Sequence, residues 1–186
     1  LSGLELAAAL TKGLNEAGVD VIDLGLVGTE MVYFATAHYG YDGGIMITAS
    51  HNPPEYNGMK MVRQESRPIS GDSGLFDIER RAHEGVWERS GAGGVRQQDA
   101  YPDFTRHLLR YNEDGALKPL KILASPGNGA AGLAMRAIGP HLPLQVAEMQ
   151  FEPDGSFPNG VPNPILPESR RDIEAGLAKG DYDFSV

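Results

Sequence analysis

Residues 45–62 constrain the fold more than any other part of the sequence, because a stiff polar loop lies there between two short apolar runs. Ile45-Met46-Ile47 predicts a buried strand, and the chain becomes apolar again from Met59. Two consecutive prolines between these runs fix φ, and Asn57-Gly58 is typical of a turn with positive φ. The pattern predicts a strand, a rigid loop and a returning strand that directs Lys60 back toward the start of the loop.

The rest of the chain alternates between helical and strand patterns. Helices are predicted from a capping box at Ser2 to Leu14, from a cap at Thr29, and over 73–83, 99–111, 130–138 and 168–179. Strands are predicted at 19–24, 120–125, 144–149 and 182–186, and the glycine-rich segment 85–98 is expected to be a mobile surface segment. This alternation predicts an α/β fold with right-handed crossovers and a largely parallel sheet.

The order of these elements predicts two α/β domains, at 1–115 and 116–186. Each domain has the helix and strand pattern of a mixed or parallel sheet covered by helices. The first helix starts with almost nothing before it, and the last strand, 182–186, has no continuation. Both domains are therefore expected to be incomplete in this chain.

Composition and charge exclude several classes of partner. The 186 residues contain 16 basic and 25 acidic side chains, a formal net charge of −9, which argues against nucleic acid or an anionic membrane surface as a partner. The sequence has no stretch long and apolar enough for a membrane span and no secretory signal pattern at its start. It contains no cysteine, so disulfides and thiolate chemistry are excluded. We expect a cytoplasmic protein.

The polar loop is the best candidate for chemistry. Ligands of open α/β sheets bind at the carboxyl ends of strands, which is where this loop begins. It brings together a hydroxyl, an imidazole, an amide and an ammonium from Ser50, His51, Asn52 and Lys60. A second glycine turn, Gly127-Asn128-Gly129, is better explained as a strand-to-helix turn than as a phosphate cradle, because its spacing matches no phosphate fingerprint.

The amino-acid sequence of the loop resembles that of a known family. Thr-Ala-Ser-His-Asn-Pro-Pro at 48–54, followed by Tyr-Asn-Gly-Met-Lys, is similar to the phosphoserine loop of the α-D-phosphohexomutases. The similarity continues at 67–72, 127–132 and 154–164, so it spans nearly the whole chain. Within the family, it is most similar to the bacterial phosphomannomutase branch.

The resemblance implies reversible transfer of phosphate between O6 and O1 of a hexose phosphate, through a hexose bisphosphate and a phosphoserine at Ser50. His51 and Lys60 are the groups available to move the Ser50 proton and to neutralise the phosphate. We favour Lys60 as the acid/base group and His51 as a phosphate or sugar-hydroxyl contact, because neighbours on an extended chain point in opposite directions and Lys60 returns from across the turn. Asn52 is expected to hold the loop or to donate to the phosphate. The resemblance also implies Mg²⁺, bound by the phosphate of Ser50 and by an aspartate loop expected after Val186. On this view residues 1–186 alone are not expected to turn over a hexose phosphate.

Three other functions stay open. A phosphoglucomutase of the same family would share every motif above. A catalytically silent homologue would use the loop only to bind a phosphosugar or a partner. A serine hydrolase is disfavoured, because Ala49 and His51 replace the glycines of a nucleophile elbow and sequence neighbours rarely form a working nucleophile and base.

Overall fold

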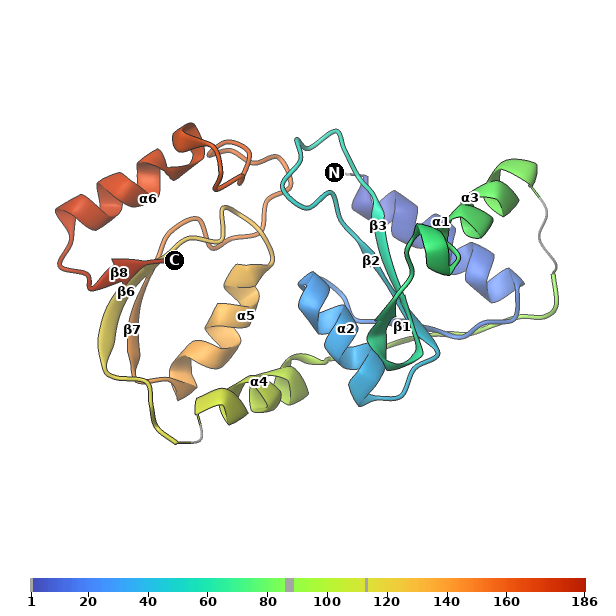
Figure 1. The fold of residues 1–186 in the computed structure, drawn as a ribbon, viewed down its shortest axis with the longest axis horizontal. Helices are drawn as coiled ribbons and strands as arrows, with labels where there is room; N and C mark the ends of the chain where they lie inside the picture. Colours follow the sequence, from blue (N-terminus) through green and yellow to red (C-terminus); the bar gives the residue numbers. More distant parts are fainter. Residues whose placement is uncertain (1, 86–88, 113) are drawn as a thin grey trace.

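The computed structural model describes residues 2–85, 89–112 and 114–186, in which helices and strands alternate along most of the chain (Figure 1). The first part of the chain contains α1 (Gly3–Glu16), β1 (Val21–Asp23), α2 (Thr29–His38), β2 (Gly43–Ile47), β3 (Met59–Arg63), β4 (Arg67–Pro68), α3 (Leu75–Glu84) and β5 (Val95–Gln97). It is followed by α4 (Tyr101–Leu109), β6 (Leu120–Ala124), α5 (Ala131–Ile138), β7 (Leu144–Glu148), α6 (Pro167–Lys179) and β8 (Phe184–Ser185). Short 3-10 helices lie at Gln64–Ser66, Gly71–Ser73, Arg110–Asn112 and Gly139–His141.

Within the described residues these strands form three small sheets. β1 pairs in parallel with β5, β6 pairs in parallel with both β7 and β8, and β2, β3 and β4 form an antiparallel sheet. The α/β class is confirmed, whereas the largely parallel sheet is wrong for β2, β3 and β4. The short loop between β2 and β3 explains the difference, because parallel neighbours need a long crossover connection.

Two predicted helix caps are wrong. Ser2 makes no side-chain cap, and its hydroxyl oxygen instead accepts a hydrogen bond from Asn57 Nδ2 at 3.1 Å. Thr29 is the first residue of α2, and the extended residue before it, Gly28, occupies the cap position. In both cases the helix forms as predicted, because the apolar face decides its existence while the cap depends on local backbone geometry.

The segment expected to be mobile contains a strand. β5 pairs with β1, and Val21 N–H donates to Gly94 O at 2.8 Å. A Cβ on Gly93 would lie 2.0 Å from Val19 O, so this close backbone approach needs a glycine. Residues 86–88 of the same segment lie outside the described residues.

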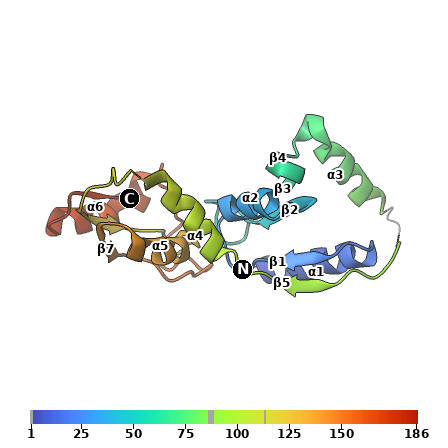
Figure 2. The ribbon, with the colours of Figure 1, turned by 90° about the horizontal axis from the view of Figure 1, so that it is seen from below.

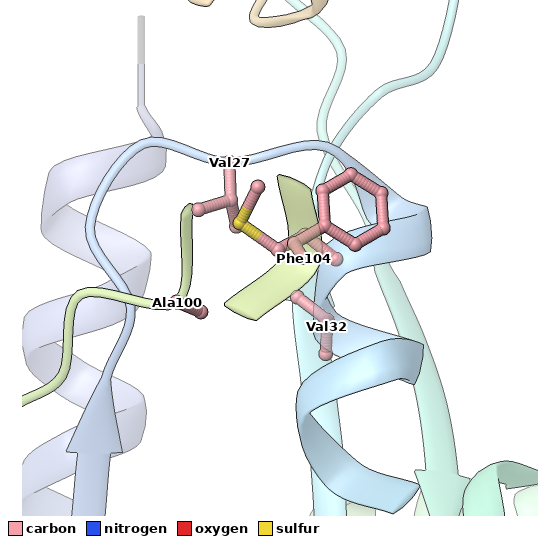
Figure 3. Close-up of a cluster of buried hydrophobic side chains, with 5 residues drawn as sticks. Val27, Val32, Ala100 and Phe104 are labelled. Carbon is pink, nitrogen blue, oxygen red and sulfur yellow. The ribbon is translucent and has the colours of Figure 1, made fainter. Parts of the chain in front are cut away.

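The core of the first part is built around α2. Five buried side chains form one cluster: Val27, Met31, Val32, Ala100 and Phe104 (Figure 3). Phe104 comes from α4, so this helix packs on α2, and it also contacts α5 of the second part. Figure 2 shows α4 lying between the two groups of elements.

A polar contact reinforces the packing of α4 on α2. The Tyr39 hydroxyl donates to Asp103 Oδ2 at 2.8 Å. Partial burial, together with this hydrogen bond, raises the pKa of Tyr39 to about 12. The same bond lowers the pKa of the Asp103 carboxyl. The predicted boundary near residue 115, which separates α4 from β6, stays a prediction.

The second part is organised around β6. Ile122, Leu123 and Ala124 are buried in this central strand. At the surface of this second part, Arg136 donates a hydrogen bond to Glu148 at 2.6 Å and lies 2.7 Å from a carboxylate oxygen of Glu152. The hydrogen bond from Arg136 lowers the pKa of Glu148. None of the helices in the described ranges has the length and apolar content that a membrane crossing requires.

Candidate functional site

The candidate site is the loop that joins β2 to β3. The ladder between the two strands runs from Gly43 paired with Arg63 to Ile47 paired with Met59. One further hydrogen bond, from Thr48 N–H to Gly58 O at 2.9 Å, closes the base of the loop. In Figure 1 the loop projects beyond the ends of both strands, beside the start of α1. The predicted strand, loop and returning strand are confirmed.

Ser50 lies exposed near the start of this loop with an unusual backbone. Its φ is 57°, in the left-handed region that residues with a Cβ rarely adopt. Its N–H donates to Thr48 Oγ1 at 2.9 Å. The hydroxyl is therefore held at a bend of the chain and is open to solvent.

His51 contacts Ser50 directly. Ser50 Oγ and His51 Nδ1 are 3.1 Å apart, within hydrogen-bonding distance. Assigning the acid/base role to Lys60 assumed that Ser50 and His51 point in opposite directions, as neighbours on an extended chain do. That assumption is wrong, because the positive φ of Ser50 breaks the alternation and brings the two side chains together.

Asn52 stabilises the loop from within. Its Nδ2 donates to Ala49 O at 2.9 Å, and its backbone N–H donates to the same oxygen at 3.1 Å. The side-chain amide oxygen and the second amide hydrogen are not used in these bonds. Asn52 therefore holds the turn around Ser50 while keeping polar atoms for a ligand.

Lys60 lies on β3 opposite Met46, and its side chain is exposed. Cross-strand partners point to the same face of a sheet, so Lys60 lies on the face of Met46, one pair away from the loop end of the hairpin. Among the described residues no hydrogen bond joins Lys60 to Ser50. The structure brings Ser50, His51 and Asn52 together and leaves Lys60 on the adjoining strand.

Sequence reasoning placed the positive φ at the wrong residue and missed Thr48. Neither Asn57 nor Gly58 has a positive φ, and the left-handed residue is Ser50. Thr48 provides the acceptor for Ser50 N–H. A threonine two residues before a turn residue is a known local hydrogen-bonding signal, and it was present in the sequence.

The second glycine turn has a structural role. Asn128 is buried, with a φ of 62°, and its N–H donates to Gln150 O at 2.8 Å. Its Nδ2 donates to Glu152 O and its Oδ1 accepts from Asn159, both at 2.9 Å. These bonds tie the turn to residues 150–159, and they use the backbone N–H, one amide hydrogen and the amide oxygen of Asn128 within the fold. The interpretation as a strand-to-helix turn fits this geometry.

The topology around Ser50 also argues against a hydrolase. A nucleophile elbow places its serine between a strand and a helix. Here the element after the loop is β3, an antiparallel strand. The contact between Ser50 and His51 removes one objection to a hydrolase. However, Ser50 lies between two strands and not in the strand-to-helix turn that a nucleophile elbow requires.

The described residues contain no group of three or more His, Cys, Asp or Glu side chains that could hold a metal ion. Ser50, if phosphorylated, would present phosphate oxygens, which are the hard ligands that Mg²⁺ prefers. One phosphate is less than the octahedral ligand set that this ion demands.

Comparisons with known proteins place these features in context. Residues 1–88 match the sequence model described as phosphoglucomutase/phosphomannomutase, alpha/beta/alpha domain I, and residues 99–186 match the model for alpha/beta/alpha domain II. A phosphomannomutase from Salmonella montevideo is 47% identical over 197 residues, covering all of this chain and 42% of the relative. A phosphomannomutase from Vibrio cholerae is 43% identical over 192 residues, again covering all of this chain and 42% of the relative.

A solved structure agrees with the sequence comparisons. The crystal structure of a phosphoglucomutase/phosphomannomutase family protein from Burkholderia thailandensis superposes with a TM-score of 0.85 at 35% identity. The superposition covers 98% of this chain and 40% of that protein. The chain thus spans about two fifths of the length of the relatives that it matches.

Proposed function

Because the chain belongs to the phosphoglucomutase/phosphomannomutase family, we propose that its protein interconverts hexose 6-phosphate and hexose 1-phosphate through phosphate carried on Ser50. The observation that supports this most is the exposed Ser50 hydroxyl at a fixed bend, 3.1 Å from His51 Nδ1. A phosphoryl carrier must be open to an incoming sugar and be held in one geometry. Ser50 meets both requirements.

The reaction has two halves. In the first, the O1 hydroxyl of hexose 6-phosphate attacks the phosphorus of phosphoserine, the bond from phosphorus to Ser50 Oγ breaks, and a hexose 1,6-bisphosphate forms. The attacking hydroxyl loses its proton and Ser50 Oγ gains one. In the second half, Ser50 Oγ loses its proton and attacks the phosphorus of the 6-phosphate of the reoriented sugar. The bond from that phosphorus to O6 breaks, O6 gains a proton, and phosphoserine and hexose 1-phosphate are formed.

Each half requires a group that moves a proton. We assign to His51 the transfer of the proton to and from Ser50 Oγ, because His51 Nδ1 lies at hydrogen-bonding distance from that atom. Lys60 lies on the neighbouring strand without a bond to Ser50. We therefore assign to Lys60 the proton transfer at the sugar hydroxyl and the neutralisation of charge on the transferred phosphate. Asn52 contributes its free amide atoms to the phosphate or the sugar.

We further propose mannose phosphate as the preferred substrate, because relatives that are 47% and 43% identical over the whole chain are named phosphomannomutases. Two other relatives, at 45% and 44% identity, have the broader name phosphohexose mutases. Glucose phosphate is the alternative within the same family. Competing the two sugars against each other in one assay distinguishes them by their ratio of kcat/KM.

Mg²⁺ is the proposed cofactor, with the Ser50 phosphate as one ligand. When bound, the ion would neutralise charge on the phosphoryl oxygens. Since the described residues provide no further group of metal ligands, the steps above are assigned to the side chains of this chain alone.

Intact-mass analysis with phosphosite mapping of the full-length protein tests the proposal. We expect a mass excess of one phosphate, located on Ser50. Ser50→Ala should lose it, and Ser70→Ala, which changes another exposed serine, should keep it. Phosphate found elsewhere, with Ser50 bare even after incubation with a hexose bisphosphate, would contradict the proposal. A phosphorylated Ser50 without any mutase turnover would instead favour a silent phosphosugar-binding homologue.

A further inference from the structure

We propose that Thr48 is a positioning residue, whose side chain holds the backbone of Ser50 in the left-handed conformation that places the Ser50 hydroxyl beside His51. The inference rests on the proposed function for its consequence, phosphoryl transfer at Ser50. Its structural content concerns the loop alone and can be tested separately.

Thr48 links Ser50 to the strand that bears Lys60 through two hydrogen bonds. Thr48 N–H donates to Gly58 O at 2.9 Å, which fixes Thr48 to the residue before β3. Thr48 Oγ1 accepts from Ser50 N–H, also at 2.9 Å. Thr48 therefore connects the Ser50 N–H to the residue before β3, alongside the bonds by which Asn52 holds the same turn.

The second bond acts on a backbone that would otherwise relax. A residue with a Cβ is less stable in the left-handed region than in the ordinary helical or extended regions. Ser50 lies there with a φ of 57°, and it is exposed, so packing gives little restraint. The Thr48 hydroxyl supplies a local restraint, because the bond to its Oγ1 requires the Ser50 N–H to point back into the loop.

The conformation matters because it brings the side chains of Ser50 and His51 together. On an extended backbone, adjacent side chains point to opposite sides. The contact of 3.1 Å between Ser50 Oγ and His51 Nδ1 depends on the bend at Ser50. Loss of the Thr48 acceptor should therefore separate the hydroxyl from the imidazole without removing either group.

The test compares four forms of the full-length protein: wild type, Thr48→Val, Thr48→Ser and the control Thr105→Val. Valine keeps the shape of threonine but has no acceptor, and serine restores the acceptor. Thr105 lies on α4, away from the loop, and controls for the loss of a threonine hydroxyl. Thr48→Ala gives the same expectation as valine, without a branched apolar side chain, should valine disturb folding.

Two measurements are made on each form. Crystal structures give φ of Ser50, which should stay positive in wild type, Thr48→Ser and Thr105→Val and leave the left-handed region in Thr48→Val. Steady-state kinetics should show kcat lowered about tenfold in Thr48→Val with little change in KM, since one net hydrogen bond corresponds to roughly a factor of ten. Thr48→Ser should recover kcat to within about twofold of wild type.

The outcomes separate the inference from the proposed function. A positive φ of Ser50 in both Thr48→Val and Thr48→Ala overturns the positioning role, and so does an equal loss of kcat in Thr48→Val and Thr48→Ser. A wild-type protein with no phosphate on Ser50 and no turnover overturns the proposed function, while the φ measurements still decide the role of Thr48.

Discussion

At the scale of single residues, the energies that hold Ser50 are closely matched. The left-handed conformation costs a residue with a Cβ about 1–2 kcal/mol. A single hydrogen bond contributes about 0.5–1.5 kcal/mol net, which is similar in size to that cost. Ser50 has such a bond to Thr48. The site is thus stabilised by local bonds within the loop and not by burial, which leaves the hydroxyl accessible to a sugar.

His51 and Lys60 should each be required in both half-reactions of the full-length enzyme. Replacing either, in His51→Ala or Lys60→Met, should lower turnover by about 10²- to 10⁴-fold, the usual effect of losing a general acid or base. His51→Ala should slow both halves, because Ser50 Oγ, which His51 contacts, gains a proton in one half and loses it in the other. Lys60→Met should also slow both halves, because a sugar hydroxyl loses a proton in one and gains one in the other. Rapid-quench measurement of single turnovers in each direction checks both rates.

Near-normal turnover in Lys60→Met would remove Lys60 from the acid/base role and leave that role to His51 or to a residue outside this chain. Arg63→Met, on the same strand and also exposed, is the matched control for loss of a cationic side chain. It should keep turnover within about threefold of wild type, since exposed charges usually contribute little.

Residue types could be predicted here, but their backbone conformations could not. The sequence of the loop identifies Ser50, His51 and Asn52 as candidate site residues, and the structure brings them together. Glycine or asparagine ordinarily marks a positive φ, so the prediction favoured Asn57-Gly58. Ser50 adopts it instead because a hydrogen bond to Thr48 compensates a conformation that serine alone disfavours.

At the scale of elements, the hairpin of β2 and β3 is held in place by its packing on α2. Gly44 of β2 lies directly against this helix, where a Cβ would come within 2.3 Å of Thr36 Oγ1 and 3.0 Å of Val32 Cγ1. Thr36 is itself buried, and its hydroxyl donates to Val32 O at 2.8 Å. The helix can approach the strand this closely only because residue 44 has no side chain.

Alanine should therefore have opposite effects at two glycines. Gly44→Ala should destabilise the protein by about 1–3 kcal/mol, because the added methyl overpacks a rigid contact. Gly13→Ala should stabilise it by about 0.5–1 kcal/mol, since Gly13 lies inside α1 with open space around it. Urea unfolding followed by circular dichroism measures both changes. Equal stability of the two variants would show that the contact at Gly44 yields easily.

Strands whose pairing partners are close in the sequence were easier to predict than strands whose partners are distant. β2 and β3 were predicted together because the loop between them contains its own turn residues. β5 was missed because its partner, β1, lies more than 70 residues earlier and its own three residues are exposed. Such a strand forms because it can pair with a strand that is distant in the sequence, so its own residues give little indication that it is a strand.

At the scale of the whole molecule, α4 joins the two parts of the chain. Its Phe104 is buried in the cluster with Val27 and Met31, while the helix also contacts α5. Tyr39, the residue directly after α2, adds a hydrogen bond to Asp103 of α4. A change in the packing of α4 should therefore reach both the sheet that supports Ser50 and the elements around β6.

Phe104→Ala should lower the free energy of unfolding by about 3–5 kcal/mol, because it removes a buried ring and leaves a cavity between α2 and α4. Phe76→Ala is the matched control: Phe76 is 67% exposed on α3, so its loss should change stability by less than about 0.5 kcal/mol. Denaturant unfolding measures both. Hydrogen exchange should show faster opening in α2 and in α5 for Phe104→Ala, since α4 contacts both. Faster exchange confined to α2 would show that α4 does not couple the two parts.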